Sequence, residues 1–140
     1  MNKAFDLKKN NSGSHYNLKI DKGKYYFEEQ QYKKTIECLS SILNLKMEDE
    51  AIKKNKDIYK LLGRAYYNDG KFPESIRIFK KILKKDPEDN ELNYFLSMAY
   101  GKLRDFNKFI HYIKQAIKYG NRNAEKIYHD FQNLRKESID

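Results

Sequence analysis

The residues that could perform catalysis or bind a metal are few and widely separated. The histidines are His15, His111 and His129, and none has a cysteine or second histidine at the spacing of a zinc site. Cys38 is the single cysteine, so the chain forms no intramolecular disulfide. There is no glycine-rich phosphate loop and no Gly-x-Ser-x-Gly motif. The sequence therefore predicts a protein that is not an enzyme and uses neither a metal nor a cofactor.

Two short clusters of carboxylates have a structural interpretation. Glu28-Glu29 lies near the expected end of a helix. Glu48-Asp49-Glu50 lies where a helix is expected to begin, and acidic residues there interact favourably with the helix dipole. Cys38 belongs to an apolar periodic stretch and is expected to be a buried small hydrophobic residue. These groups give no reason to predict catalysis.

Composition and charge restrict the class of protein. The chain has 140 residues, enough for one domain, and its aromatic content of 14% is too high for a disordered chain. The formal net charge is +9, but basic residues outnumber acidic ones by only two in 1–49, four in 50–89 and three in 90–140. Such an even distribution favours a solvated helical surface over a nucleic-acid site.

Neither a membrane span nor a secretion signal is evident. No run approaches the roughly 18 to 20 apolar residues of a membrane-spanning helix. Residues 1–14 are polar, lack the apolar core of a signal peptide and are predicted to be a flexible leader. We expect a soluble chain in an unknown compartment, which could be a fragment of a longer anchored protein.

The remaining chain alternates helical patterns with short breaks. The breaks are Asn68-Asp69-Gly70, Asp86-Pro87-Glu88-Asp89 and Tyr119-Gly120-Asn121. Three pairs of similar residues recur at a spacing of 34: Leu62 with Leu96, Tyr66 with Tyr100, and Phe72 with Phe106. Tyr32 precedes Phe72 by 40 residues, and we expect the charged stretch 47–55 to lengthen a helix or its connection.

A 34-residue period is that of the tetratricopeptide repeat, and residues 56–89 resemble a nearly complete one. The resemblance rests on Tyr59, Leu62, Gly63, Tyr66, Gly70, Phe72, Ser75, Phe79 and Pro87. Only Ile82, where the family has a small residue, departs clearly. The resemblance implies an all-α fold, a right-handed α-solenoid of antiparallel helix pairs with about seven helices.

The flanking regions resemble the same repeat less closely. Residues 90–123 retain Leu96, Ser97, Tyr100, Phe106, Phe109, Ile113 and Ala116. Residues 16–49 retain Gly23, Tyr26, Tyr32, Thr35, Leu39 and Ile42, but Lys19 and Lys22 stand where apolar residues are expected. In 123–136, Ala124, Ile127, Phe131 and Leu134 form the apolar stripe of a capping helix. A tetratricopeptide-repeat domain is thus expected over 15–140.

The resemblance also implies a concave groove, lined by the first helix of each repeat, in which a partner segment lies. The groove positions are those left over once packing positions are assigned. They yield a predicted binding set of Lys24, Phe27, Lys60, Arg64, Tyr67, Asn68, Tyr94, Met98, Lys102, Tyr128 and Arg135. Aromatic residues and arginine are common energetic anchors of interfaces. We therefore expect a partner segment with apolar and acidic side chains. Alternatively, these residues pack on a terminal extension or a neighbouring copy.

One known type of groove is excluded by the residue types. Relatives that capture the acidic tail of heat-shock chaperones use a clamp of lysine, asparagine and arginine. The corresponding residues here are Ile20, Lys24, Leu61, Glu91 and Phe95. Only Lys24 is basic, and Glu91 would repel a carboxylate. No chaperone-tail clamp is expected.

The sequence thus predicts a protein-interaction scaffold that binds a partner protein or peptide in its groove. The lysine- and asparagine-rich composition suggests a bacterial protein, and assembly of an envelope-associated complex is one hypothesis. Two alternatives stay open: a helical-repeat protein associated with nucleic acid, and a structural module that forms a homodimer.

Overall fold

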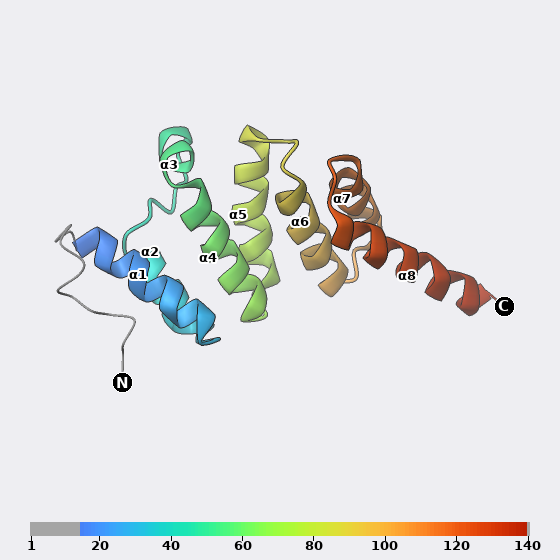
Figure 1. The fold of residues 1–140 in the computed structure, drawn as a ribbon, viewed down its shortest axis with the longest axis horizontal. Helices are drawn as coiled ribbons and strands as arrows, with labels where there is room; N and C mark the ends of the chain where they lie inside the picture. The colour runs from blue at the N-terminus through green and yellow to red at the C-terminus, as the bar shows by residue number, and fades with distance from the viewer. Residues whose placement is uncertain (1–14, 140) are drawn as a thin grey trace. The chain divides into compact units, whose positions relative to one another are not determined.

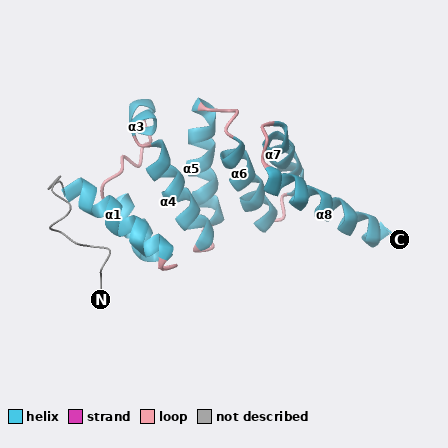
Figure 2. Ribbon diagram, in the orientation of Figure 1, coloured by secondary structure: helices cyan, strands magenta, loops and turns pink. Residues whose placement is uncertain are grey.

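A computed structural model describes residues 15–139 (Figure 1). The predicted leader, residues 1–14, lies outside the described residues. The described part contains eight helices and no strand (Figure 2), so the prediction of an all-α fold is confirmed. The helices are α1 (His15–Glu28), α2 (Tyr32–Ser40), α3 (Asp49–Lys54), α4 (Lys56–Asn68), α5 (Phe72–Lys85), α6 (Asn90–Lys102), α7 (Phe106–Lys118) and α8 (Arg122–Ile139).

The chain divides into two compact units, Met1–Ile78 and Phe79–Asp140. The boundary falls inside α5, so this helix contributes its first half to the first unit and its second half to the second. In the first unit α2 packs against both α1 and α4, while in the second unit α7 packs against both α6 and α8.

The contact between α1 and α2 explains a glycine of the repeat pattern. A Cβ atom at Gly23 would lie 2.7 Å from Cδ2 of Leu39, which is fully buried. The hydroxyl of Thr35 on α2 donates a hydrogen bond of 3.2 Å to the Gly23 carbonyl. Since a side chain at position 23 would separate the helices, the close contact requires glycine there.

The charged stretch before α4 forms a connection with a short helix of its own. α2 ends at Ser40, earlier than the repeat pattern suggested, so Ile42 lies beyond it. The added helix α3 accounts for the eight helices observed where about seven were expected. The connection is anchored at Asn44, whose carbonyl accepts a hydrogen bond of 2.7 Å from the buried Tyr59 hydroxyl.

The second unit has a compact core between α7 and α8. Its buried members are Phe109, Ile113, Ala116 and Ala124. On α6, the Asn93 amide is buried, and it donates hydrogen bonds to the carbonyls of Pro87 and Asp89 at 3.1 and 2.9 Å. A buried amide is tolerated here because the preceding turn accepts its hydrogen bonds.

Each helix of the second unit that follows α5 begins at a capping side chain. Asp89 accepts a hydrogen bond from the Leu92 amide, Asp105 from Lys108 and Asn121 from Ala124, at 2.9, 3.3 and 2.9 Å. These bonds satisfy amides that have no partner within the first helical turn. Asn121, which replaces the closing proline of the repeat, thus begins the next helix.

Four helices end in separate turns of the same type. One residue in each turn has a positive φ: Gln30 (60°), Gly70 (80°), Arg104 (61°) and Gly120 (97°). The following amide donates to a carbonyl five residues earlier, as from Lys71 to Tyr66 at 2.8 Å and from Asp105 to Tyr100 at 3.0 Å. This is the Schellman ending, for which glycine is the favoured residue. Two of the four turns adopt it without glycine.

Candidate partner-binding site

The first unit brings two of the predicted binding residues into contact. Phe27 on α1 and Arg64 on α4 are half-buried, and the Arg64 Cζ atom lies 4.9 Å from the centre of the Phe27 ring. This distance is that of a cation–π interaction, which here joins two different helices. Lys60 is half-buried on α4, while Lys24 and Asn68 are exposed.

The aromatic members of this set also take part in packing, which the sequence analysis did not assign to them. Phe27 forms an edge-to-face pair with Tyr32, the first residue of α2, at 5.5 Å between ring centres. Tyr67 forms the same kind of pair with Phe72, the first residue of α5, at 5.3 Å. Both rings therefore stabilise a turn and leave only part of their surface for a partner.

In the second unit, the predicted residues lie on α6 and α8. Tyr94 and Tyr128 are half-buried and pack against the core of that unit. Arg135 is exposed, and its Cζ atom lies 5.6 Å from the centre of the Phe131 ring. Met98 is half-buried and Lys102 is exposed. A single groove formed by all the predicted residues of both units stays a prediction.

The second unit has an apolar hollow that the sequence analysis missed. Its volume is about 630 Å³, and we refer to it as the α7–α8 hollow. It is lined by Phe106, Asn107 and Ile110 on α7 and by Phe131, Leu134, Arg135 and Ser138 on α8. Of these, only Arg135 belongs to the predicted binding set.

Two residues of this hollow are unusually exposed for large apolar side chains. Phe106 is 42% exposed and Leu134 is 63% exposed. The repeat resemblance places Phe106 at a packing position and predicts a core residue, and this prediction is wrong. Phe106 contacts Phe131 at 5.8 Å between ring centres, while much of its surface stays open to solvent. The apolar spacing along α8 was the one signal that could have pointed to this site.

Two arginines lie against aromatic rings of the hollow. The Arg135 guanidinium lies over Phe131, and the Cζ atom of Arg104 lies 5.8 Å from the centre of the Phe106 ring. Among the residues that line the hollow, none is acidic. The arrangement suits a ligand with large apolar groups and negative charges beside them.

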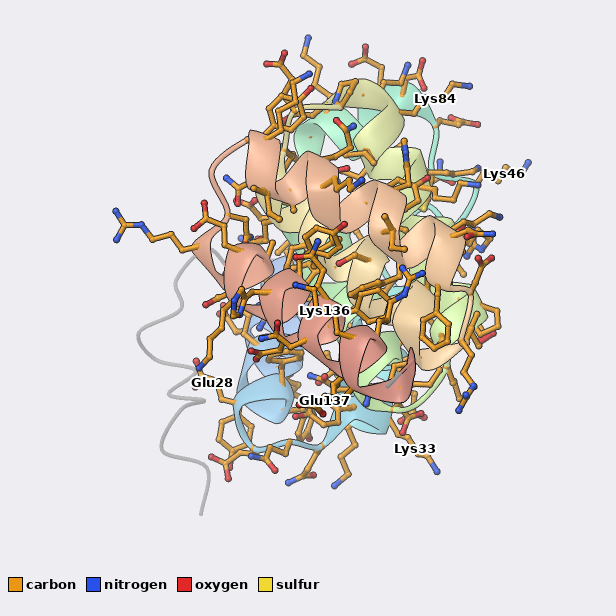
Figure 3. All side chains as sticks on the ribbon, turned by 90° about the vertical axis from the view of Figure 1, so that its right-hand side faces the viewer. Glu28, Lys33, Lys46, Lys84, Lys136 and Glu137 are labelled. Carbon is orange, nitrogen blue, oxygen red and sulfur yellow. The ribbon has the colours of Figure 1, made fainter. Side chains whose placement is uncertain are left out.

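Charged side chains of both signs cover the exposed surface. Figure 3 labels six charged side chains, Glu28, Lys33, Lys46, Lys84, Lys136 and Glu137, and all six are exposed. Over residues 15–139, no group of three histidine, cysteine or acidic side chains is placed to hold a metal ion. The helices in that range include none that is long and apolar enough to cross a membrane.

Comparisons with known proteins agree with the helical-repeat fold. Residues 56–89 match the family model described as the tetratricopeptide repeat, the same 34 residues in which the pattern is most complete. Among solved structures, "MamA MSR-1 C2" has the same fold, with a TM-score of 0.66 and 22% sequence identity. That match covers 78% of this chain and 59% of the MamA chain. Among curated proteins, none matches.

Proposed function

We propose that this tetratricopeptide-repeat protein is a non-enzymatic scaffold that binds a segment of a partner protein. The observation that carries the proposal is the α7–α8 hollow, where aromatic and aliphatic side chains stay exposed together. A soluble domain seldom leaves such side chains uncovered in one concave place unless they meet a ligand or partner.

The form of the hollow indicates what kind of segment it binds. Phe106 and Ile110 are four residues apart on α7, and Phe131 and Leu134 are three apart on α8, so two apolar stripes line it. A short amphipathic helix laid between two such stripes can bury its apolar face. Arg104 and Arg135 would then pair with acidic residues at the edge of that helix.

The predicted residues of the first unit are proposed as a second surface of the same chemistry. Phe27 and Arg64 present an aromatic ring and a guanidinium group together, and Tyr67 is half-buried on the same helix as Arg64. Arginine and tyrosine contribute strongly to many interfaces because they combine a large contact area with hydrogen-bonding groups. Assembly of a bacterial envelope complex is a narrower hypothesis within this proposal.

The test is affinity capture from a native extract, followed by titration of the recombinant partner. Leu134→Asp places a negative charge in the α7–α8 hollow and should weaken binding at least tenfold. Leu45→Asp is the matched control, because Leu45 is also exposed (47%) but lies in the first unit outside both surfaces. Arg64→Glu and Tyr94→Ala, measured as single variants, test the predicted set in each unit.

Each outcome bears on the proposal. Loss of the same protein with Leu134→Asp, but not with Leu45→Asp, supports it. Retention of the partner by the Leu134→Asp protein excludes the hollow as the binding site. A dimer of the wild type that Leu134→Asp converts to a monomer, measured by sedimentation, would favour the homodimer instead. Capture of nuclease-sensitive nucleic acid alone would favour the nucleic-acid alternative.

A further inference from the structure

Lys19 and Lys22 stand at repeat positions where apolar residues are expected, and the proposed function gives them no role. Both are half-buried on α1. They line a hollow of about 500 Å³, here named the α1–α2 hollow, together with Tyr26 of α1 and Lys34, Glu37, Cys38 and Ser41. The α1 residues are spaced by three and four, as are those from Lys34 to Ser41, so one stripe from each segment lines the hollow.

The charges of this hollow are not balanced. Three lysines line it against one carboxylate, Glu37. Within residues 15–139, neither Lys19 nor Lys22 forms an ion pair with a carboxylate. Like charges gathered in one place repel one another, and an anion bound among them relieves that repulsion. An anionic ligand would supply the compensation that the described residues do not.

Two groups that line the hollow, Lys34 and Cys38, are in states compatible with a bound anion. The Lys34 Nζ atom lies 5.4 Å from the centre of the Tyr26 ring, a cation–π contact that restrains this ammonium group from the side of α2. Burial raises the pKa of the Cys38 thiol, although Lys19 and Lys22 partly oppose the rise. The thiol therefore stays protonated near neutral pH and adds no negative charge.

We propose that the α1–α2 hollow binds a phosphorylated ligand that carries at least two negative charges. Lysine ammonium groups bind phosphate as point charges, and three of them from two helices can reach different oxygens of one ligand. A singly charged anion would leave an excess of positive charge, since the lysines outnumber Glu37 by two. The hollow is also large enough for a small molecule rather than a single ion.

The direct test is calorimetric titration of the full chain with sodium triphosphate at constant ionic strength. We expect micromolar binding to the wild type and a loss of at least tenfold in the double variant Lys19→Gln, Lys22→Gln. The control is Lys33→Gln, Lys46→Gln, which removes the same charge from exposed positions of the same unit and should change affinity less than twofold. Equal weakening in both double variants would overturn the site, because it would indicate general charge attraction. An absence of triphosphate binding to the wild type would also overturn it.

Cys38 provides a readout that does not depend on charge. Because Cys38 lines the hollow, a bound ligand should slow its modification by a small neutral thiol reagent. We expect triphosphate to slow the reaction several-fold in the wild type and in the Lys33→Gln, Lys46→Gln protein only. Unchanged labelling of the wild type would contradict the proposal. Far-UV circular dichroism checks that all three proteins retain the same helix content.

Vesicles distinguish a phosphorylated lipid headgroup from a soluble ligand. The probe is phosphatidylcholine vesicles with and without phosphatidylinositol bisphosphate, measured by co-sedimentation. Binding that requires the phosphorylated lipid, Lys19 and Lys22, and that triphosphate displaces, identifies a headgroup ligand. Triphosphate binding without vesicle binding identifies a soluble one. Leu134→Asp should change neither result, so failure of this site is distinguishable from failure of the proposed scaffold function.

Discussion

The two units begin their helices in different ways. In the second unit, α6, α7 and α8 each begin at an aspartate or asparagine whose side chain caps the first turn. In the first unit, α2, α3 and α4 begin at Gln31, Glu48 and Asn55, and none of these side chains makes a capping hydrogen bond. Capping stabilises a helix within a few residues of sequence, so helix formation in the second unit is supported locally.

The first unit relies instead on contacts between distant residues. Asn55, at the start of α4, uses its side-chain oxygen to accept a hydrogen bond of 2.6 Å from the Tyr16 hydroxyl on α1. The Tyr59 hydroxyl on α4 donates a hydrogen bond to the Asn44 carbonyl within the 41–55 connection, and Gly23 allows Leu39 to approach α1. The same fold thus obtains helix stability from local groups in one unit and from tertiary contacts in the other.

The largest expected effect comes from disturbing the contact between α1 and α2. Gly23→Val forces a branched side chain against the buried Leu39 and should lower the free energy of unfolding by about 2–3 kcal/mol. Urea unfolding followed by circular dichroism at 222 nm measures this value. The control is Gly101→Ala on α6, whose Cβ would lie 3.3 Å from Phe109 Cδ1 and should cost about 1 kcal/mol or less. Similar losses of unfolding free energy in the two variants would show that the first unit depends on its α1–α2 contact no more than the second unit depends on the contact at Gly101.

The second prediction removes a local cap from the other unit. Asn121→Ala loses the bond to the Ala124 amide and the bond of 3.1 Å to Asn90, and should cost about 1–2 kcal/mol. Amide hydrogen exchange should increase first in the initial turn of α8. If exchange rises equally along the whole unit, then α8 does not depend on its own cap.

The third prediction transfers a cap from the second unit to the first. Gln31 has φ and ψ of −96° and 70°, close to the −86° and 80° of Asp105, which does cap its helix. Gln31→Asp should therefore cap α2 and raise the free energy of unfolding by about 0.5–1 kcal/mol. Gln31→Ala is the control for loss of the glutamine. If Gln31→Asp stabilises the protein and Gln31→Ala does not, the backbone at position 31 already permits a cap, and α2 lacks one only because residue 31 is glutamine.

The smallest effect compares two turns with a positive φ. Gln30→Gly removes the strain of a left-handed residue and should stabilise the protein by about 0.5 kcal/mol. Arg104→Gly should gain less, because Arg104 also lies over the Phe106 ring at 5.8 Å and this contact is lost. Thermal unfolding of the two variants measures which substitution stabilises the protein more. A larger gain from Arg104→Gly would show that the arginine contact contributes little.

The sequence predicts the repeat well where its signals are local. Leu62, Gly63, Tyr66 and Pro87 identify the repeat at 56–89 because they stand at fixed positions within a single 34-residue unit. Residues 41–55 show the limit of such signals. The acidic run 48–50 predicts the start of a helix, and α3 does begin at Asp49. The connection before it is held by a buried side chain from elsewhere, Tyr59, and no local period encodes that support.

The proposed binding surfaces could be predicted only in part. Phe27 and Arg64 were selected because they are left over from the packing pattern, and the structure places them in contact. Phe106 could not be identified as exposed, because it follows Phe72 by 34 residues and so falls at a packing position of the repeat. Exposure depends on which helix lies across from a residue, and that is a property of the tertiary arrangement.

The amino-acid sequence by itself determined the helical class, the 34-residue unit and the residue types at its packing positions, because these follow from the local periodicity of side chains. The tertiary structure decided which of those side chains stay uncovered. Lys19 and Lys22 face a hollow with Lys34, and Phe106 and Leu134 share another with Arg135, although each group comes from separate helices. Residues far apart in the chain acquire a common environment only when their helices pack, and that environment sets what each hollow can bind.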